Sequence, residues 1–276
     1  MYLVSGSSNP TLAAGLAQQL GVELVQPDIT EFANSERKVT LPPKLKNHRV
    51  ILVQSFTQPV DTHIMEYLLM TDALERIGAE EVWAVIPWLG YSMQDKVFQP
   101  GEPIAAKVVA NLVSNSFTHR VFLLDLHNPR IPGFFSVPTQ HLTADQLFVQ
   151  HVTENLDLSQ AVVASPDFGG LKRARTFADQ LNLELVNIDK DRSLLTGEVT
   201  EMELHGDVQG KTVLVYDDVI LSGGTAAHAA KLIASYPVVE RRGEAHRIPR
   251  HPGRLNGLVD GPGGAHRGPR PETDAI

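Results

Sequence analysis

Short apolar runs alternate with helical patterns over most of the chain. Runs such as Glu81–Pro87 and Arg120–Leu126 are continuously apolar, which is typical of strands buried on both faces of a parallel sheet. Leucines recur every fourth residue from Leu12 to Leu20, as an amphipathic helix requires. The expected strands are Tyr2–Val4, Arg49–Gln54, Glu81–Pro87, Arg120–Leu126, Ala161–Ala164, Leu183–Ile188 and Lys211–Tyr216, and the expected helices are one ending at Leu20, Asp61–Ile77, Pro103–Ser116, Leu171–Leu181 and Thr225–Tyr236.

This alternation of strands and helices predicts an α/β fold, with mostly parallel sheets that are flanked by helices. The pattern occurs twice, so we expect two similar domains, an N-terminal one over residues 1–142 and a C-terminal one over 143–236. Neither half carries a sequence repeat strong enough to prove duplication.

The last 40 residues, 237–276, break the pattern. They hold seven of the 21 glycines, six of the 18 prolines and seven arginines, with no lysine. No strand or helix period survives there, which predicts disorder or irregular loop. Two interpretations remain open: a basic arm that binds a partner, or a non-native end produced by a shifted reading frame. We favour the second, because the composition changes abruptly.

Composition and charge exclude several classes of protein. The 276 residues are 42% hydrophobic, enough for a buried core, and they contain no cysteine, which excludes disulfide scaffolds, thiolate zinc sites and cysteine nucleophiles. The net charge of −8 argues against a general nucleic-acid binder. The start of the chain lacks the pattern of a signal peptide, and no apolar run approaches the ~20 residues that span a bilayer. We therefore expect a cytoplasmic protein without a membrane partner.

The strongest chemical signal follows the strand Lys211–Tyr216. Asp217 and Asp218 form an acidic pair, and the loop Leu221-Ser222-Gly223-Gly224-Thr225 then opens a helix. Glycines let backbone amides approach an anion, hydroxyls donate hydrogen bonds, and the helix dipole favours phosphate. Acids beside a phosphate loop suit a sugar phosphate, because carboxylates accept hydrogen bonds from ribose hydroxyls. The alternative is an ordinary helix cap beside two exposed acids.

Three further strand ends carry candidate residues. Asp167 precedes a glycine pair and a helix with Lys172, Arg173 and Arg175, which predicts a second phosphate or metal site or, alternatively, a solvated helix face. His127 lies at the end of a buried strand. It could act there as a ligand, or it could be a packed, hydrogen-bonded side chain. Lys190 and Arg192 also end a strand, and could offset charge on a transferring phosphoryl group or form a surface charge cluster.

Taken in this order, the segments resemble the ribose-phosphate pyrophosphokinase family. The resemblance runs from about Leu3 to about Ser235. It is carried by the segments SGSSNPTLAAGLAQQLG, FANSE, IMEYLLMTDALERIGAEEVWAVIPWLGYSMQD, PGEPIAAKVVANL, DLHNPRIPGFF, SPDFGGLKRAR and VYDDVILSGGT. The resemblance implies two domains of the type I phosphoribosyltransferase-like fold. It also implies transfer of the β,γ-pyrophosphoryl group of ATP to the 1-hydroxyl of ribose 5-phosphate, with Mg²⁺ as cofactor, in a homo-oligomer.

The resemblance also assigns roles to residues. Lys190 and Arg192 match the catalytic lysine and arginine, and His127 and Asp167 match metal-associated positions. The residues matching the ATP site are Phe32, Asn34, Ser35, Glu36, Met93 and Gln94, with adenine usually held across a subunit interface. Those matching the ribose 5-phosphate site are Arg192, Asp217, Asp218, Leu221, Ser222, Gly223, Gly224 and Thr225.

Some positions depart from the family's pattern. Met93 stands where arginine is usual, Ser35 where glycine is usual, and Leu221 where an acid or small polar residue is frequent. The tail also lacks the strand that usually completes the second domain. These departures leave the alternative of a non-catalytic nucleotide-binding subunit. A phosphoribosyltransferase, which shares the acidic pair and the phosphate loop, is a second alternative, and the specific motifs of the first half argue against it.

Overall fold

The computed structural model describes residues 1–192 and 199–235, including their side chains except at 189–192 and 199–203. All of these residues belong to one compact unit, Met1–Val238. The tail 237–276, for which the sequence predicts disorder or a non-native end, lies outside the described residues. Among the described helices, none is both long and apolar enough to cross a membrane.

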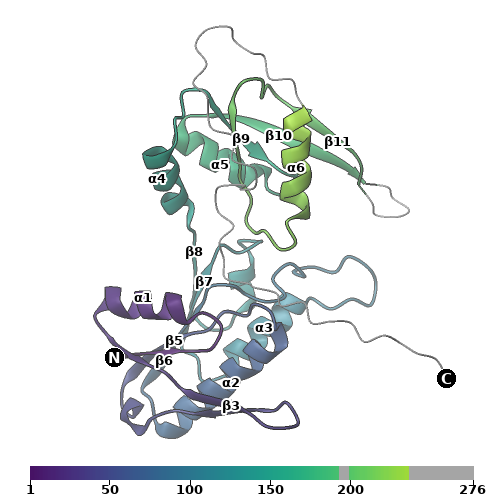
Figure 1. Cartoon of the computed structure of the whole chain (residues 1–276). Helices are drawn as coiled ribbons and strands as arrows, with labels where there is room; N and C mark the ends of the chain where they lie inside the picture. Colours follow the sequence, from purple (N-terminus) through teal and green to yellow (C-terminus); the bar gives the residue numbers. More distant parts are fainter. Residues whose placement is uncertain (193–198, 236–276) are drawn as a thin grey trace, which may run out of the picture. The chain divides into compact units, whose positions relative to one another are not determined.

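The first half of the chain forms a six-stranded sheet in the order β2-β1-β5-β6-β7-β8, with every neighbouring pair parallel (Figure 1). Helix α1 packs on one face, and α2 and α3 pack on the other. A separate hairpin, β3-β4, is antiparallel. The elements are β1 (Tyr2–Ser5), α1 (Pro10–Leu20), β2 (Glu23–Val25), β3 (Asp28–Glu31), β4 (Arg37–Thr40), η1 (Pro43–Leu45), β5 (Arg49–Val53), α2 (Val60–Ile77), β6 (Glu81–Ile86), α3 (Ala105–Ser114), β7 (Arg120–Leu124), η2 (Ile131–Phe134) and β8 (Thr139–Leu142).

The second half of the chain forms a four-stranded sheet in the order β11-β10-β9-β12. The pairs with β9 are parallel, and β10-β11 is antiparallel. Helices α4 and α5 pack on one face and α6 on the other. The elements are α4 (Asp145–Asn155), β9 (Ala161–Ser165), α5 (Leu171–Leu181), β10 (Glu184–Arg192), β11 (Val199–His205), β12 (Thr212–Val215) and α6 (Gly224–Ser235).

The central strands are buried on both faces because consecutive side chains point to opposite sides of a sheet. Leu3 of β1 packs with α1, whereas its neighbour Val4 packs with the cluster that contains α2 and α3. In the second sheet, Val162 packs with α6 and Val163 packs with α4 and α5. The continuous apolar runs of the sequence therefore reflect two-sided burial, and the predicted α/β fold with mostly parallel sheets is confirmed.

Gly206 gives a stability prediction for the second half. Its φ is +133°, and an added Cβ would lie 2.5 Å from Cγ1 of Val186, which is 2% exposed. Gly206→Ala should therefore lower the free energy of unfolding by about 1–3 kcal/mol, through backbone strain and overpacking. The free energy of unfolding of each variant is measured by urea denaturation. Gly15→Ala is the matched control: it lies inside α1 with open space around it, and should raise stability by roughly 0.5–1 kcal/mol. Equal stability of the two variants would contradict the argument.

Candidate active site

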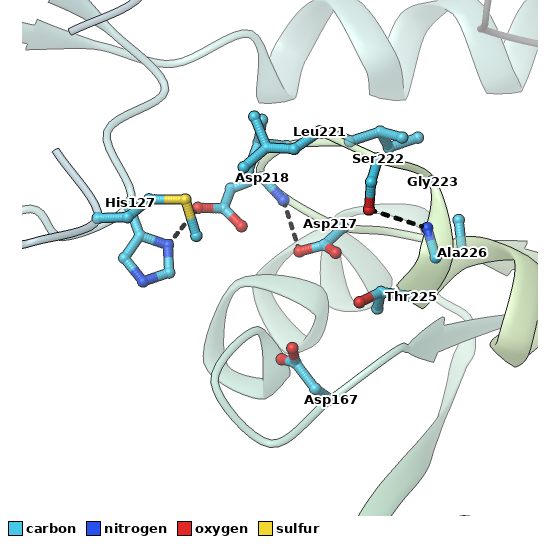
Figure 2. Close-up of a pocket in the computed structure, with 13 residues that line it drawn as sticks. His127, Asp167, Asp217, Asp218, Leu221, Ser222, Gly223, Thr225 and Ala226 are labelled. Atoms are coloured by element: carbon cyan, nitrogen blue, oxygen red, sulfur yellow. Dashed lines mark hydrogen bonds and ion pairs between the residues drawn. The ribbon is translucent and has the colours of Figure 1, made fainter. Parts of the chain in front are cut away.

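One pocket gathers polar residues that follow β7, β9 and β12 (Figure 2). Ligands of α/β proteins bind at the carboxyl ends of strands, which is where these residues lie. Four of the lining residues are titratable and the rest come mainly from the loop between β12 and α6. The lining consists of Met93, His127, Asp167, Asp217, Asp218, Val219, Ile220, Leu221, Ser222, Gly223, Gly224, Thr225 and Ala226.

The loop before α6 has the form that the sequence predicts for a phosphate site. Gly223 has a φ of +76°, in the left-handed region that favours glycine, and α6 begins at the next residue. The helix thus starts at Gly224, one residue earlier than expected. Ser222 Oγ accepts the Gly224 N–H at 3.4 Å. The first residues of α6 line the pocket, so the positive end of the helix dipole faces the space where a phosphate would bind.

Tyr216 fixes the end of β12 directly before the acidic pair. Its N–H donates to the Ala164 carbonyl at 3.0 Å, and its ring stacks on Phe177 with centroids 4.1 Å apart. Its hydroxyl donates to the Asp145 carboxylate. Burial, reinforced by that carboxylate, raises the pKa of Tyr216, so it stays a neutral donor. The backbone leading into Asp217 is therefore held by three contacts.

The two acids of the pair have different environments. Asp217 Oδ1 accepts the N–H of Asp218 at 2.9 Å, and the residue lines the pocket. The side chain of Asp218 is only 9% exposed, and its Oδ2 lies 2.8 Å from Nδ1 of His127 (Figure 2). The same oxygen lies 3.2 Å from Nη1 of Arg173. Asp218 is therefore engaged by other side chains, which the sequence did not predict.

Asp167 approaches the acidic pair next to Gly170. Its Oδ1 accepts the N–H of Gly170 at 2.9 Å. A Cβ on Gly170 would lie 3.3 Å from Ser165 Oγ, 3.6 Å from Asp167 Oδ1 and 3.9 Å from Asp217 Oδ1. Two carboxylates that follow different strands thus lie close to the same point beside Gly170.

The loop that carries His127 has an unusual backbone held by its neighbours. Asp125 has a φ of +43°, and its Oδ1 accepts the N–H of Ala144 at 3.1 Å. The N–H of Leu126 donates to Nε2 of His141 at 3.0 Å. Burial lowers the pKa of His141, which favours the neutral ring with the lone pair that this contact requires. The His127 ring itself is 41% exposed.

The donor set of the pocket fits Mg²⁺ that arrives with a phosphate ligand. Among the described residues, no three His, Asp or Glu side chains converge as a preformed metal site. His127 and Asp167 nevertheless line the same pocket as Asp217. Mg²⁺ usually keeps several waters and binds one or two protein carboxylates plus substrate phosphates. The pocket offers this kind of partial coordination.

The loop after β1 has a similar strand–loop–helix context but is filled by the protein's own side chains. Glu66 is fully buried and accepts hydrogen bonds from Ser7 N and Ser7 Oγ, both at 2.8 Å. It also accepts from Nε2 of Gln54 at 3.0 Å. An internal carboxylate thus occupies the donors of this loop, whereas the loop after β12 faces the pocket.

Comparisons with known proteins agree with this architecture. The model for the N-terminal domain of ribose phosphate pyrophosphokinase matches residues 1–116, and that for the phosphoribosyl transferase domain matches 140–240. The ribose-phosphate pyrophosphokinase of Bradyrhizobium diazoefficiens is 41% identical over 228 residues, covering 83% of this chain and 72% of that protein. The enzyme of that name from Caldanaerobacter subterraneus is 38% identical, with 87% and 76% covered. The chain belongs to the ribose-phosphate pyrophosphokinase family.

A solved structure supports the same assignment. The crystal structure of phosphoribosylpyrophosphate synthetase from Mycobacterium smegmatis matches with a TM-score of 0.79 at 34% identity. The match covers 86% of this chain and 78% of that one. The resemblance derived from the sequence motifs is thereby confirmed.

The residues expected at the adenine site of this pyrophosphokinase lie in the turn between β3 and β4. Ser35 has a φ of +68°, which explains why the family usually has glycine there. Phe32 is 53% exposed, and its N–H donates to the Glu36 carbonyl at 2.8 Å. Glu36 N–H donates to Oδ1 of Asn34 at 3.3 Å. None of these four is among the residues that line the described pocket, so their role in binding adenine stays a prediction.

The two residues expected beside the ATP phosphates differ in position. Met93 lines the pocket and is 40% exposed. Gln94 is also exposed but does not belong to the pocket lining; its carbonyl accepts the N–H of Ala106 at 3.1 Å. A methionine at this position offers polarizable surface but no charge to a phosphate.

Met93→Arg is expected to lower the KM for ATP by about 3–10-fold, with kcat changed less. A guanidinium at the pocket would form a charge-assisted hydrogen bond to a phosphate in the ground state and the transition state alike. Steady-state kinetics of AMP formation measures this. The matched control is Met65→Arg, since Met65 is 52% exposed on α2, away from the pocket lining. An unchanged KM in Met93→Arg would show that residue 93 does not contact the nucleotide.

The expected catalytic pair lies on β10. The backbone of Lys190 pairs with Met202, and that of Arg192 pairs with Val199, across the antiparallel β10-β11 ladder. Their side chains and residues 193–198 lie outside the described part of the chain, so the catalytic roles of this pair remain predictions.

Sequence reasoning left the role of Arg173 open. Of the three basic residues early in α5, Lys172 and Arg175 are exposed, which fits a solvated face. Arg173 is instead partly buried and contacts Asp218. Its spacing carries a signal: Arg173 lies four residues before the buried Phe177 and next to the buried Ala174, so it belongs to the inner face of the helix.

Proposed function

We propose that this chain transfers the pyrophosphoryl group of ATP to the 1-hydroxyl of ribose 5-phosphate, giving phosphoribosyl pyrophosphate and AMP. This is the reaction expected of the pyrophosphokinase family to which the chain belongs. The observation that carries the proposal is one pocket that combines a phosphate loop, an acid suited to ribose hydroxyls and two metal-associated residues. The match to the family's own N-terminal domain favours this reaction over that of a phosphoribosyltransferase.

The protein's contribution to the reaction is positioning and charge. The loop Leu221–Thr225 would hold the 5′-phosphate, while Asp217 accepts hydrogen bonds from the sugar, directing the 1-hydroxyl toward the nucleotide. Lys190 and Arg192 would offset charge on the transferring group. His127 and Asp167 would hold Mg²⁺, which neutralises phosphate charge when bound.

Cellular context and assembly are also part of this proposal. The chain would act in the cytoplasm as a homo-oligomer in which the turn 32–36 reaches ATP bound by a neighbouring subunit. The exposed Phe32 and the absence of residues 32–36 from the lining of the described pocket support shared sites.

The test measures AMP release from Mg-ATP by the purified chain, with and without ribose 5-phosphate. AMP that forms only in the presence of the sugar phosphate, together with phosphoribosyl pyrophosphate, supports the proposal. A folded chain that binds ATP but forms no AMP would instead be a non-catalytic subunit. Consumption of phosphoribosyl pyrophosphate with a nucleobase would identify a phosphoribosyltransferase.

A further inference from the structure

We propose that Arg173 is a positioning residue of this reaction, which holds both the carboxylate of Asp218 and the backbone of His127 so that the His127 ring presents Nε2 to its ligand. The inference rests on the proposed function, because the ligand of His127 is the metal–nucleotide complex. Arg173 itself contacts no substrate in this scheme.

The Arg173 guanidinium contacts both Asp218 and the backbone of residues 126 and 127. Nη1 of Arg173 lies 3.2 Å from Oδ2 of Asp218. Nη2 donates to the main-chain carbonyls of Leu126 at 3.2 Å and of His127 at 3.3 Å. The Arg173 side chain is 28% exposed, so these contacts are partly shielded from water. The guanidinium therefore joins α5 to the loop after β7 and to the loop after β12.

Asp218 and His127, both contacted by Arg173, also contact each other. The same Oδ2 of Asp218 lies 2.8 Å from Nδ1 of His127. An ionised carboxylate only accepts hydrogen bonds, so Nδ1 must carry the proton in this contact. In the neutral ring Nε2 then holds the lone pair. Metal-binding histidines commonly donate their other N–H to a carboxylate, which fixes the tautomer and the ring orientation. Asp218 is placed to do this for His127, and Arg173 is placed to keep Asp218 there.

The geometry requires arginine rather than a generic cation. A planar guanidinium directs two nitrogen atoms at separate acceptors, whereas an ammonium is a compact point charge. A lysine at position 173 could neutralise Asp218 or reach the carbonyls, but could not span both. Arg173→Lys thus keeps the charge and removes the bridge.

The first experiment compares Arg173→Lys with Arg175→Lys, a control on the exposed face of the same helix. The readout is the tautomer of His127 in the substrate-free protein, from ¹⁵N NMR of histidine-labelled chain assigned by a His127→Gln variant. We expect the Nδ1–H tautomer in the native chain and in Arg175→Lys, and a mixture of tautomers in Arg173→Lys. Faster amide hydrogen exchange over residues 126–131 should accompany it. Should Arg173→Lys not fold, Arg173→Gln takes its place, since its amide can still donate to one carbonyl.

The second experiment separates positioning from a purely structural role. In Arg173→Lys, kcat/KM for Mg-ATP should fall about tenfold, as is common when a partner of a metal ligand is lost, with a smaller change for ribose 5-phosphate. A lower melting temperature with an unchanged His127 tautomer and unchanged kcat/KM would overturn the inference. If the native chain released no AMP, the proposed function would fail, while the tautomer would still report whether Arg173 positions His127.

Discussion

Replacing Lys190 with alanine is expected to lower kcat by about 100–1000-fold, the range typical for loss of one group that stabilises transition-state charge. The KM values for ATP and ribose 5-phosphate should change by less than about threefold, because an interaction made only in the transition state does not appear in ground-state binding. The backbone of Lys190 lies on β10, which pairs with β9, and Asp167 follows β9 closely. The family resemblance supplies the charge-neutralising role.

The measurement is steady-state AMP formation with each substrate varied in turn. Lys231→Ala is the matched control, since Lys231 is exposed on α6 and absent from the pocket lining. Its kcat should equal that of the native chain. A Lys190→Ala enzyme with native kcat would remove Lys190 from catalysis, and one with a raised KM for ATP but native kcat would make it a binding residue.

The central elements of the fold could be predicted because two-sided burial leaves continuous apolar runs. Strands β5, β6 and β7 and helices α2 and α5 lie where the sequence placed them, within a few residues at their ends.

The hairpin β3-β4 and helix α4, which the sequence did not predict, have few buried side chains. The hairpin β3-β4 is short and largely exposed, so its alternating pattern rests on few positions such as the Ile29–Val39 pair. Helix α4 has a single buried residue, Val152, and Leu147 on it is 69% exposed, so it lacks a clear apolar face.

For the site, sequence reasoning identified residue types but not their partners. The Asp217–Asp218 pair and the phosphate loop were recognisable because strand, acids, glycines and helix are contiguous in the chain. The contact of Asp218 with His127 joins residues 91 positions apart, and only the fold brings them together. The two acids, interpreted alike from the sequence, therefore have different environments: Asp217 lies towards Asp167 across Gly170, and Asp218 contacts Arg173 and His127.

This division of the pair leads to the last prediction. Asp217→Asn is expected to lower kcat/KM for ribose 5-phosphate by roughly 10–150-fold, which corresponds to loss of a hydrogen bond to a charged group worth about 1.5–3 kcal/mol. The amide keeps the size of the side chain, and its Oδ1 can still accept the Asp218 N–H, so the loop should fold as in the native chain. The KM for ATP at saturating Mg²⁺ should change little.

The control for Asp217→Asn is Asp179→Asn, which removes an equal charge from an exposed position on α5. Its kinetics should match those of the native chain. The informative contrary result is a raised KM for ATP with an unchanged KM for ribose 5-phosphate. Since Oδ1 of Asp167 and Oδ1 of Asp217 both lie within 4 Å of the position that a Cβ on Gly170 would take, that outcome would place Asp217 with the metal–nucleotide side of the pocket. The sugar would then have to be held by the phosphate loop and by Asp218, whose Oδ2 contacts Arg173 and His127 but which also lines the pocket.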